Sequence, residues 1–149
     1  MKKILFLLVL IAGGCAMTYA PPVTISPVVA SQVSDKAATM TRAKRALIER
    51  GERIEHIDDD VIVTSMRNKK LTPAEADCGK TMGLDYLKDA RTKTQLGYTV
   101  SVSGENLIVQ ANIQGEYKPG AVDQNITLTC VSRGVLEDDL LSAILTRPK

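Results

Sequence analysis

Few side chains in this 149-residue chain could do covalent or ligand chemistry: three cysteines, one histidine and a run of aspartates. The thiols of Cys15, Cys78 and Cys130 could be acylated or oxidised. His56 could act as a base only with a nucleophile held beside it, and no local motif supplies one. The aspartates at 58–60 lack the spaced oxygens and the glycine of an EF-hand loop, so they read as a polar turn.

The sequence has no glycine-rich phosphate loop and none of the patterns CxxC, HExxH and GxSxG. Two thiols and one distant histidine are also a poor ligand set for zinc. We therefore expect no catalytic residue, no metal site and no cofactor.

The first residues have the layout of a secretory signal. Lys2 and Lys3 form a positive start, an apolar run covers 4–12, and Gly13 and Gly14 precede Cys15. We expect residues 1–14 to be a signal peptide. Two alternatives stay open. One is an ordinary signal cut elsewhere, for example after Ala20, and the other is an uncleaved anchor, although residues 4–20 fall short of the ~20 residues that usually span a bilayer.

Residues 10–15, Leu-Ile-Ala-Gly-Gly-Cys, resemble the lipobox of bacterial lipoproteins, with Ala12 where leucine is usual. The resemblance implies a diacylglycerol on the Cys15 thiol, cleavage before Cys15 and a third acyl chain on its amine. Several acyl chains anchor a protein stably, whereas one does so only marginally. Because Ala16 is not the aspartate that favours inner-membrane retention, the resemblance implies an outer-membrane lipoprotein that faces the periplasm.

If lipid occupies Cys15, an even pair of cysteines remains in an exported chain. Disulfides persist in oxidising compartments, so we expect a Cys78–Cys130 bridge; two free buried thiols are the alternative. Cleavage would also remove Lys2 and Lys3, leaving 17 basic side chains against 17 acidic ones. A domain without net charge has no strong electrostatic footprint for nucleic acid, so no nucleic-acid partner is expected.

Residues 15–34 read as a lipidated tether. Pro21, Pro22 and Pro27 favour an extended chain of about 3.1 Å per residue, which would reach roughly 50–60 Å. The alternative is that the valines and isoleucine of this segment pair as a strand with the domain or with a partner.

Residues 35–149 are expected to form one domain that begins and ends with a helix. The first helix covers 35–50, with Ser34 as its cap and Gly51 after it, and the second covers about 135–146. Thr72, Pro73 and Glu75 have helix-start chemistry, which predicts a short helical turn near 73–77 and irregular chain after it.

Strands are predicted at 53–57, 61–66, 98–103, 107–114 and 126–131, the first two joined by the acidic turn. The segment 61–63 is β-branched throughout, so it could be buried on both faces. The later strands alternate apolar and polar residues, which indicates an antiparallel sheet with one wet face. The predicted fold is a two-layer α+β sandwich: about five antiparallel strands with both helices on one face.

The wet face is the predicted interaction surface, because it would be flat and nearly uncharged. An ordinary solvated face is the alternative. Its residues are Thr99, Ser101, Gln110, Asn112, Gln114, Thr127 and Thr129. The basic run at 67–70 could contact lipid headgroups or the glycan wall, or could be a solvated loop.

Residues 46–64, a helix end, a glycine, and two strands around an acidic turn, loosely resemble small domains of envelope lipoproteins, such as the accessory lipoprotein of the outer-membrane β-barrel assembly machine. This resemblance transfers no functional residue. The first hypothesis is a non-enzymatic accessory subunit that binds an envelope protein. The second is a ligand-binding lipoprotein with a pocket of roughly 300 Å³ or more between sheet and helices. The third is an envelope hydrolase centred on His56 or paired acids.

Overall fold

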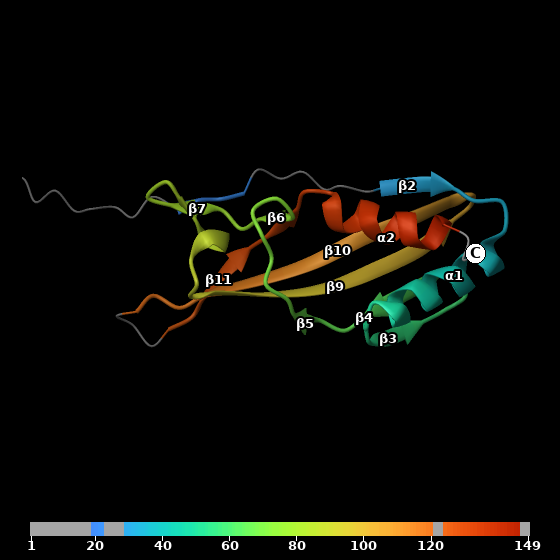
Figure 1. Cartoon of the computed structure of the whole chain (residues 1–149), viewed down its shortest axis with the longest axis horizontal. Coiled ribbons are helices and arrows are strands. Elements are labelled where there is room, and N and C mark those ends of the chain that lie inside the picture. The colour runs from blue at the N-terminus through green and yellow to red at the C-terminus, as the bar shows by residue number, and fades with distance from the viewer. Residues whose placement is uncertain (1–18, 23–28, 121–123, 147–149) are drawn as a thin grey trace, which may run out of the picture.

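The structure is a computed structural model that describes residues 19–22, 29–120 and 124–146. The expected signal peptide, Cys15 and Ala16 lie outside these residues. Within them the chain is a mixed α+β fold with a large antiparallel sheet and two helices (Figure 1). No helix in the described part is long and apolar enough to cross a membrane.

Both predicted helices are present. Helix α1 covers Lys36–Glu49, and its cap is Asp35, not Ser34: the Asp35 carboxylate accepts a hydrogen bond from the Ala38 amide at 2.9 Å. Gly51 follows with a φ of +73°, as a left-handed terminating residue requires. Helix α2 covers Val135–Leu145 and begins after Gly134, whose φ is +91°.

The main sheet has seven strands, so the expected number of about five is too low. Its continuous order is β11-β10-β9-β4-β3, with β2 pairing β10 and β5 pairing β9. The strands are β2 (Val29–Gln32), β3 (Ile54–Ile57), β4 (Val61–Thr64), β5 (Arg67–Asn68), β9 (Thr92–Ser103), β10 (Asn106–Tyr117) and β11 (Ile126–Thr129). β9 and β10 form a twelve-residue antiparallel ladder, longer at both strands than predicted.

The helices lie together on one face of this sheet. Helix α1 contacts α2, β4 and β9, while α2 contacts β2 and β10 (Figure 1). Aliphatic side chains fill the space between the helices and the sheet, including the fully buried Leu47, Ile62, Val100 and Leu140. The apolar residues of the alternating strands therefore point toward the helices and form the core, as predicted.

The strand predicted at 126–131 is divided at Cys130. β11 stays in the main sheet, whereas β12 (Val131–Ser132) leaves it and pairs with β6 (Ala76–Asp77). Cys78 directly follows β6 and is bonded to Cys130, so the chain turns away at the residue that the disulfide holds. A third small sheet has the order β1-β7-β8: β1 (Tyr19–Ala20), β7 (Lys80–Thr81) and β8 (Leu84–Asp85).

The helical turn predicted at 73–77 is wrong, although its local chemistry is present. The Glu75 carboxylate accepts hydrogen bonds from the Thr72 amide at 2.8 Å and the Thr72 hydroxyl at 2.9 Å. The chain makes a single turn there, because β6 begins at Ala76. The short 3₁₀ helix of this region, η1, lies later, at Tyr86–Lys88.

Two strands belong to the segment expected to act as a tether. β1 pairs with β7, and β2 pairs with β10. For these residues the alternative expectation, strand pairing with the domain, is what the structure has. The reach of 50–60 Å therefore does not apply, since the chain is already held by the domain at Tyr19.

Candidate functional site

The seven residues predicted as an interaction surface all lie on the sheet face that points away from the helices. Directly opposed residues of an antiparallel ladder share a face, and Thr99 opposes Gln110 while Gln114 opposes Thr129. Ser101, Asn112 and Thr127 are an even number of residues away on the same strands. Three of the seven (Thr99, Ser101 and Asn112) are half-buried and the other four are exposed.

Three aliphatic residues also belong to this surface, here called the uncovered face. Val61 and Ile108 both oppose Ser101, and Val63 opposes Thr99. All three are half-buried, so β4 is not buried on both faces as the sequence suggested. The uncovered face therefore has an apolar region beside the polar one, whereas the sequence pattern alone described a purely polar surface.

The polar part is ordered by side-chain hydrogen bonds. The Asn112 amide donates to the Thr99 hydroxyl at 3.0 Å, and the Gln95 amide donates to the Asn68 carbonyl oxygen at 3.2 Å. A hollow of about 300 Å³ lies beside the second pair; its lining residues are Asn68, Lys93, Gln95, Gln114, Gly115, Glu116 and Thr127. Lys93 and Glu116 oppose each other across the ladder, which adds one charge of each sign.

Sequence reasoning missed the part of this hollow that comes from β5 and the start of β9, because β9 was expected to begin at 98. A signal was available. In the sequence, the long polar residues Lys93 and Gln95 alternate with Thr94 and Leu96, and the structure buries the latter two.

The predicted Cys78–Cys130 disulfide is present, and it lies behind Gly115 on the opposite side of β10 from the hollow. The two Cα atoms are 4.1 Å apart. A methyl group on Gly115 would come 2.7 Å from the Cys130 sulfur and 3.2 Å from the Leu128 Cβ. The disulfide therefore packs directly on the backbone of β10, where only glycine fits.

One buried carboxylate holds the same strand from the helix side. Glu137 is fully buried in the first turn of α2. Its Oε1 accepts from the Ala111 amide at 3.1 Å, and its Oε2 accepts from the Ser132 hydroxyl at 2.5 Å. β2 pairs with β10 at 106–109 and β11 at 114–117, so Ala111 lies where neither strand covers the edge. In the sequence alone, Glu137 is only an acidic residue near the start of a predicted helix, where a negative charge is favourable.

The basic run at 67–70 is not a free solvated loop. Arg67 donates from Nε and Nη2 to the buried Glu52 carboxylate at 2.7 and 2.5 Å, and this hydrogen bonding raises the pKa of the guanidinium. Asn68 belongs to β5, and the Lys69 ammonium lies 3.7 Å from a Glu75 carboxylate oxygen. The run is therefore part of the sheet edge.

His56 and the acidic turn lie on open surface. The His56 Nε2 is 2.8 Å from Oδ2 of Asp58, both side chains are exposed, and Asp60 forms an ion pair with Lys36. Among the contacts of the described residues, no third side chain joins His56 and Asp58 in a catalytic arrangement. The described ranges also contain no cluster of three or more His, Cys, Asp or Glu side chains that could hold a metal.

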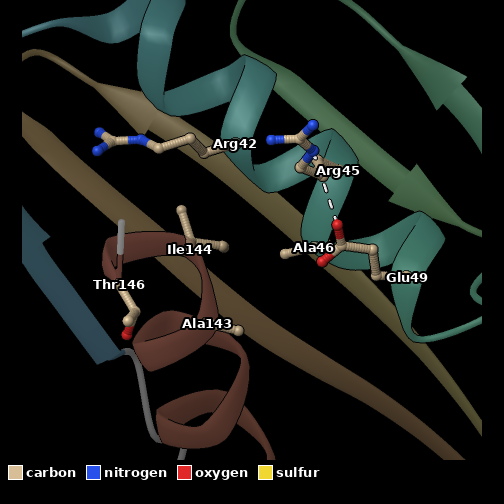
Figure 2. Close-up of a pocket in the computed structure, with 7 residues that line it drawn as sticks. All are labelled: Arg42, Arg45, Ala46, Glu49, Ala143, Ile144 and Thr146. Atoms are coloured by element: carbon tan, nitrogen blue, oxygen red, sulfur yellow. Dashed lines mark ion pairs between the residues drawn. The ribbon is translucent and has the colours of Figure 1, made fainter. Parts of the chain in front are cut away.

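A hollow of about 490 Å³ lies between α1 and the end of β3 with the acidic turn that follows it, so it is one between a helix and the sheet. A smaller hollow lies between the two helices. Figure 2 shows Arg42 and Arg45 of α1 on one side, Thr146 on the other, and the buried Ala46 and Ile144 between them. Its volume is about 250 Å³. The Arg42 Nη2 donates to the Thr39 hydroxyl at 3.0 Å, within its own helix.

A scan against protein-family models finds no match for the chain, and a search of curated proteins finds no matching sequence.

Proposed function

We propose that the chain is a bacterial lipoprotein, anchored in the outer membrane by acyl chains on Cys15 and facing the periplasm. It acts there as a non-enzymatic accessory subunit that binds an envelope protein through the uncovered face. The membrane part of the proposal depends on the lipobox-like residues 10–15 and on Ala16. The Cys78–Cys130 disulfide agrees with an oxidising compartment such as the periplasm.

The observation that carries the binding part is the composition of the uncovered face. Val61, Val63 and Ile108 are half-buried there, and neither of the two described helices covers them. They lie beside exposed amides such as Gln110 and Gln114. Protein interfaces combine an apolar centre with a polar, hydrogen-bonding rim. The long, hydrogen-bonded β9–β10 ladder supplies a rigid support for such a surface.

The test is affinity purification of the lipidated protein from detergent-solubilised envelopes. We expect the native chain to return a stoichiometric partner and the double variant Gln110→Lys/Gln114→Lys to lose it. Ser142→Lys/Thr146→Lys is the matched control, because it adds the same two charged side chains at exposed positions at the end of α2, on the other side of the molecule. Circular dichroism of each variant checks that the fold is retained.

A clean monomer without a partner would refute the binding part of the proposal, as would equal loss of the partner in the control. Intact-mass measurement tests the anchor separately: acyl chains should be present on Cys15 and absent in Cys15→Ser. Unmodified Cys15 would refute the anchor.

A further inference from the structure

The β7–β8 hairpin presents two large apolar side chains to solvent. Its strands pair as Lys80 with Asp85 and Thr81 with Leu84, so Met82 and Gly83 form a two-residue turn. Met82 is 76% exposed and Leu84 is 72% exposed, the two highest values among the exposed large hydrophobic residues of the described part. Single exposed apolar side chains are normal on folded proteins, whereas neighbouring ones at one tip are a feature of contact sites.

The turn also has a residue that its backbone does not favour. Met82 has a φ of +49° and Gly83 a φ of +78°, the positive values that a tight hairpin turn of this type requires. Asparagine, aspartate and glycine adopt such angles readily, but methionine does so at a conformational cost. Met82 is the one non-glycine residue with positive φ in the described part. Its apolar side chain is thus kept at the tip despite that cost.

The hairpin tip lies next to the point where the chain arrives from Cys15. β1 pairs antiparallel with β7, with Tyr19 opposite Thr81 and Ala20 opposite Lys80. The chain therefore enters β1 from the tip side of the hairpin. Tyr19 is four residues after Cys15, and four residues span at most about 14 Å. Figure 1 shows β7 at the end of the molecule away from α1.

From these observations we infer that the β7–β8 hairpin is a membrane contact, in which Met82 and Leu84 enter the acyl layer beside the lipid on Cys15. This inference rests on the anchor proposed above. An anchor held within about 14 Å brings the tip to the bilayer surface, where apolar side chains are stabilised in the acyl region. Lys80 and Lys88 are exposed on the same segment and suit the phosphate layer, while Asp85 is hydrogen-bonded to the Leu87 amide.

The test uses oxidation of methionine by hydrogen peroxide, followed by peptide mass spectrometry. The full chain carrying I48M is purified from envelopes and placed in vesicles of phosphatidylethanolamine and phosphatidylglycerol. The same chain without residues 1–15, and therefore without signal peptide or lipid, is the reference in buffer. Ile48 is 55% exposed near the C-terminal end of α1, a helix that Figure 1 shows well away from β7, so the methionine introduced there reports an exposed site away from the hairpin.

We expect oxidation of Met82 to slow about tenfold or more in the vesicles, while oxidation at position 48 changes little. Leu84→Ser, an exposed change that leaves the core intact, should return part of the lost Met82 reactivity. An acylated, vesicle-bound protein whose Met82 oxidises as fast as in the reference would overturn this inference and leave the proposed anchor standing. Equal protection at both positions would also overturn it. An unacylated Cys15 would overturn the anchor and this inference together.

Discussion

Replacement of Glu137 by leucine tests how the fold satisfies the Ala111 amide of β10, which lies between the residues that pair with β2 and those that pair with β11. Leucine has a similar volume but accepts no hydrogen bond. In the native chain the Glu137 carboxylate is the acceptor for two donors from different elements, the Ala111 amide of β10 and the Ser132 hydroxyl of β12. Glu137→Leu leaves both donors without that acceptor in a buried place.

The magnitude follows from those two groups. A buried donor left unsatisfied costs about 1–3 kcal/mol. The Ser132 hydroxyl can rotate to another acceptor, whereas the Ala111 amide is fixed by the strand, so the amide contributes most of the loss. The leucine side chain recovers part of it through its own burial, and we expect a net decrease of about 2 kcal/mol in the free energy of unfolding.

Glu137→Gln separates hydrogen bonding from charge. The glutamine carbonyl can accept from the Ala111 amide, and its amide can donate to the Ser132 hydroxyl oxygen. Only the favourable charge at the start of α2 is lost, worth about 0.3–1 kcal/mol at exposed sites. Asp138→Asn is the matched control, because Asp138 lies in the same helical turn but is exposed.

The assay is urea unfolding followed by far-ultraviolet circular dichroism, with hydrogen exchange of the Ala111 amide as a local measure. The expected order of destabilisation is leucine well above glutamine, with glutamine close to the Asp138→Asn control. A leucine variant within about 0.5 kcal/mol of the native chain would refute the reasoning, because the Ala111 amide would then have no need of this acceptor. Equal losses for leucine and glutamine would assign the effect to charge instead.

Four further outcomes are expected. Replacing Cys78 and Cys130 by serine should lower the free energy of unfolding by about 4 kcal/mol, since the bridged residues are 52 positions apart; urea unfolding of oxidised and reduced native chain is the check. Gly115→Ala should cost about 1–3 kcal/mol by urea unfolding, and less in the serine background, where the crowding sulfur is gone. Burial raises the pKa of Tyr98 to about 12 from 10.0, so the unfolded chain ionises first. The contribution of Tyr98 to the free energy of unfolding is complete below pH ~10 and falls by about 1.4 kcal/mol per pH unit between pH ~10 and ~12. When unfolding is measured across this pH range, the stability of Tyr98→Phe should decrease less than that of the native chain. Met82→Asn should raise the free energy of unfolding by up to about 1 kcal/mol, and with it the midpoint of thermal unfolding, because asparagine adopts a positive φ readily. An unchanged midpoint would contradict the account of the turn.

The sequence predicted those parts of the fold that local periodicity determines. Met40, Ala43 and Leu47 recur at helical spacing and are buried on α1. In the same way, alternation with a period of two assigned Gln110 and Thr99 to the uncovered face. The disulfide was predictable from cysteine number and compartment, once Cys15 was assigned to lipid.

Long-range pairing was not predictable in this way. Whether β2 adds to the edge of β10, and whether β12 leaves the sheet for β6, depends on partners far away in the sequence. The start of β9 is a weaker signal in the sequence, because Gly97 interrupts the alternation and glycine weakens a strand pattern when only propensity is considered. In the structure a methyl group at Gly97 would come 2.9 Å from the Met66 sulfur, so the glycine allows a close approach inside a continuous strand.

Pairing of β1 with the domain changes how the two proposals relate to each other. A free tether of some 50–60 Å would let the domain rotate, and the uncovered face could meet a partner at any height above the bilayer. With the chain held at Tyr19, the hairpin end stays near the proposed anchor at Cys15. β9 and β10 run from that end toward α1 (Figure 1), and twelve residues of strand extend about 40 Å. If both proposals hold, position along the rigid ladder sets the height above the bilayer at which the uncovered face meets the proposed partner. The hollow at Gln95 and Gln114 lies nearer the hairpin end, and the apolar region at Val63 and Ile108 lies farther from it.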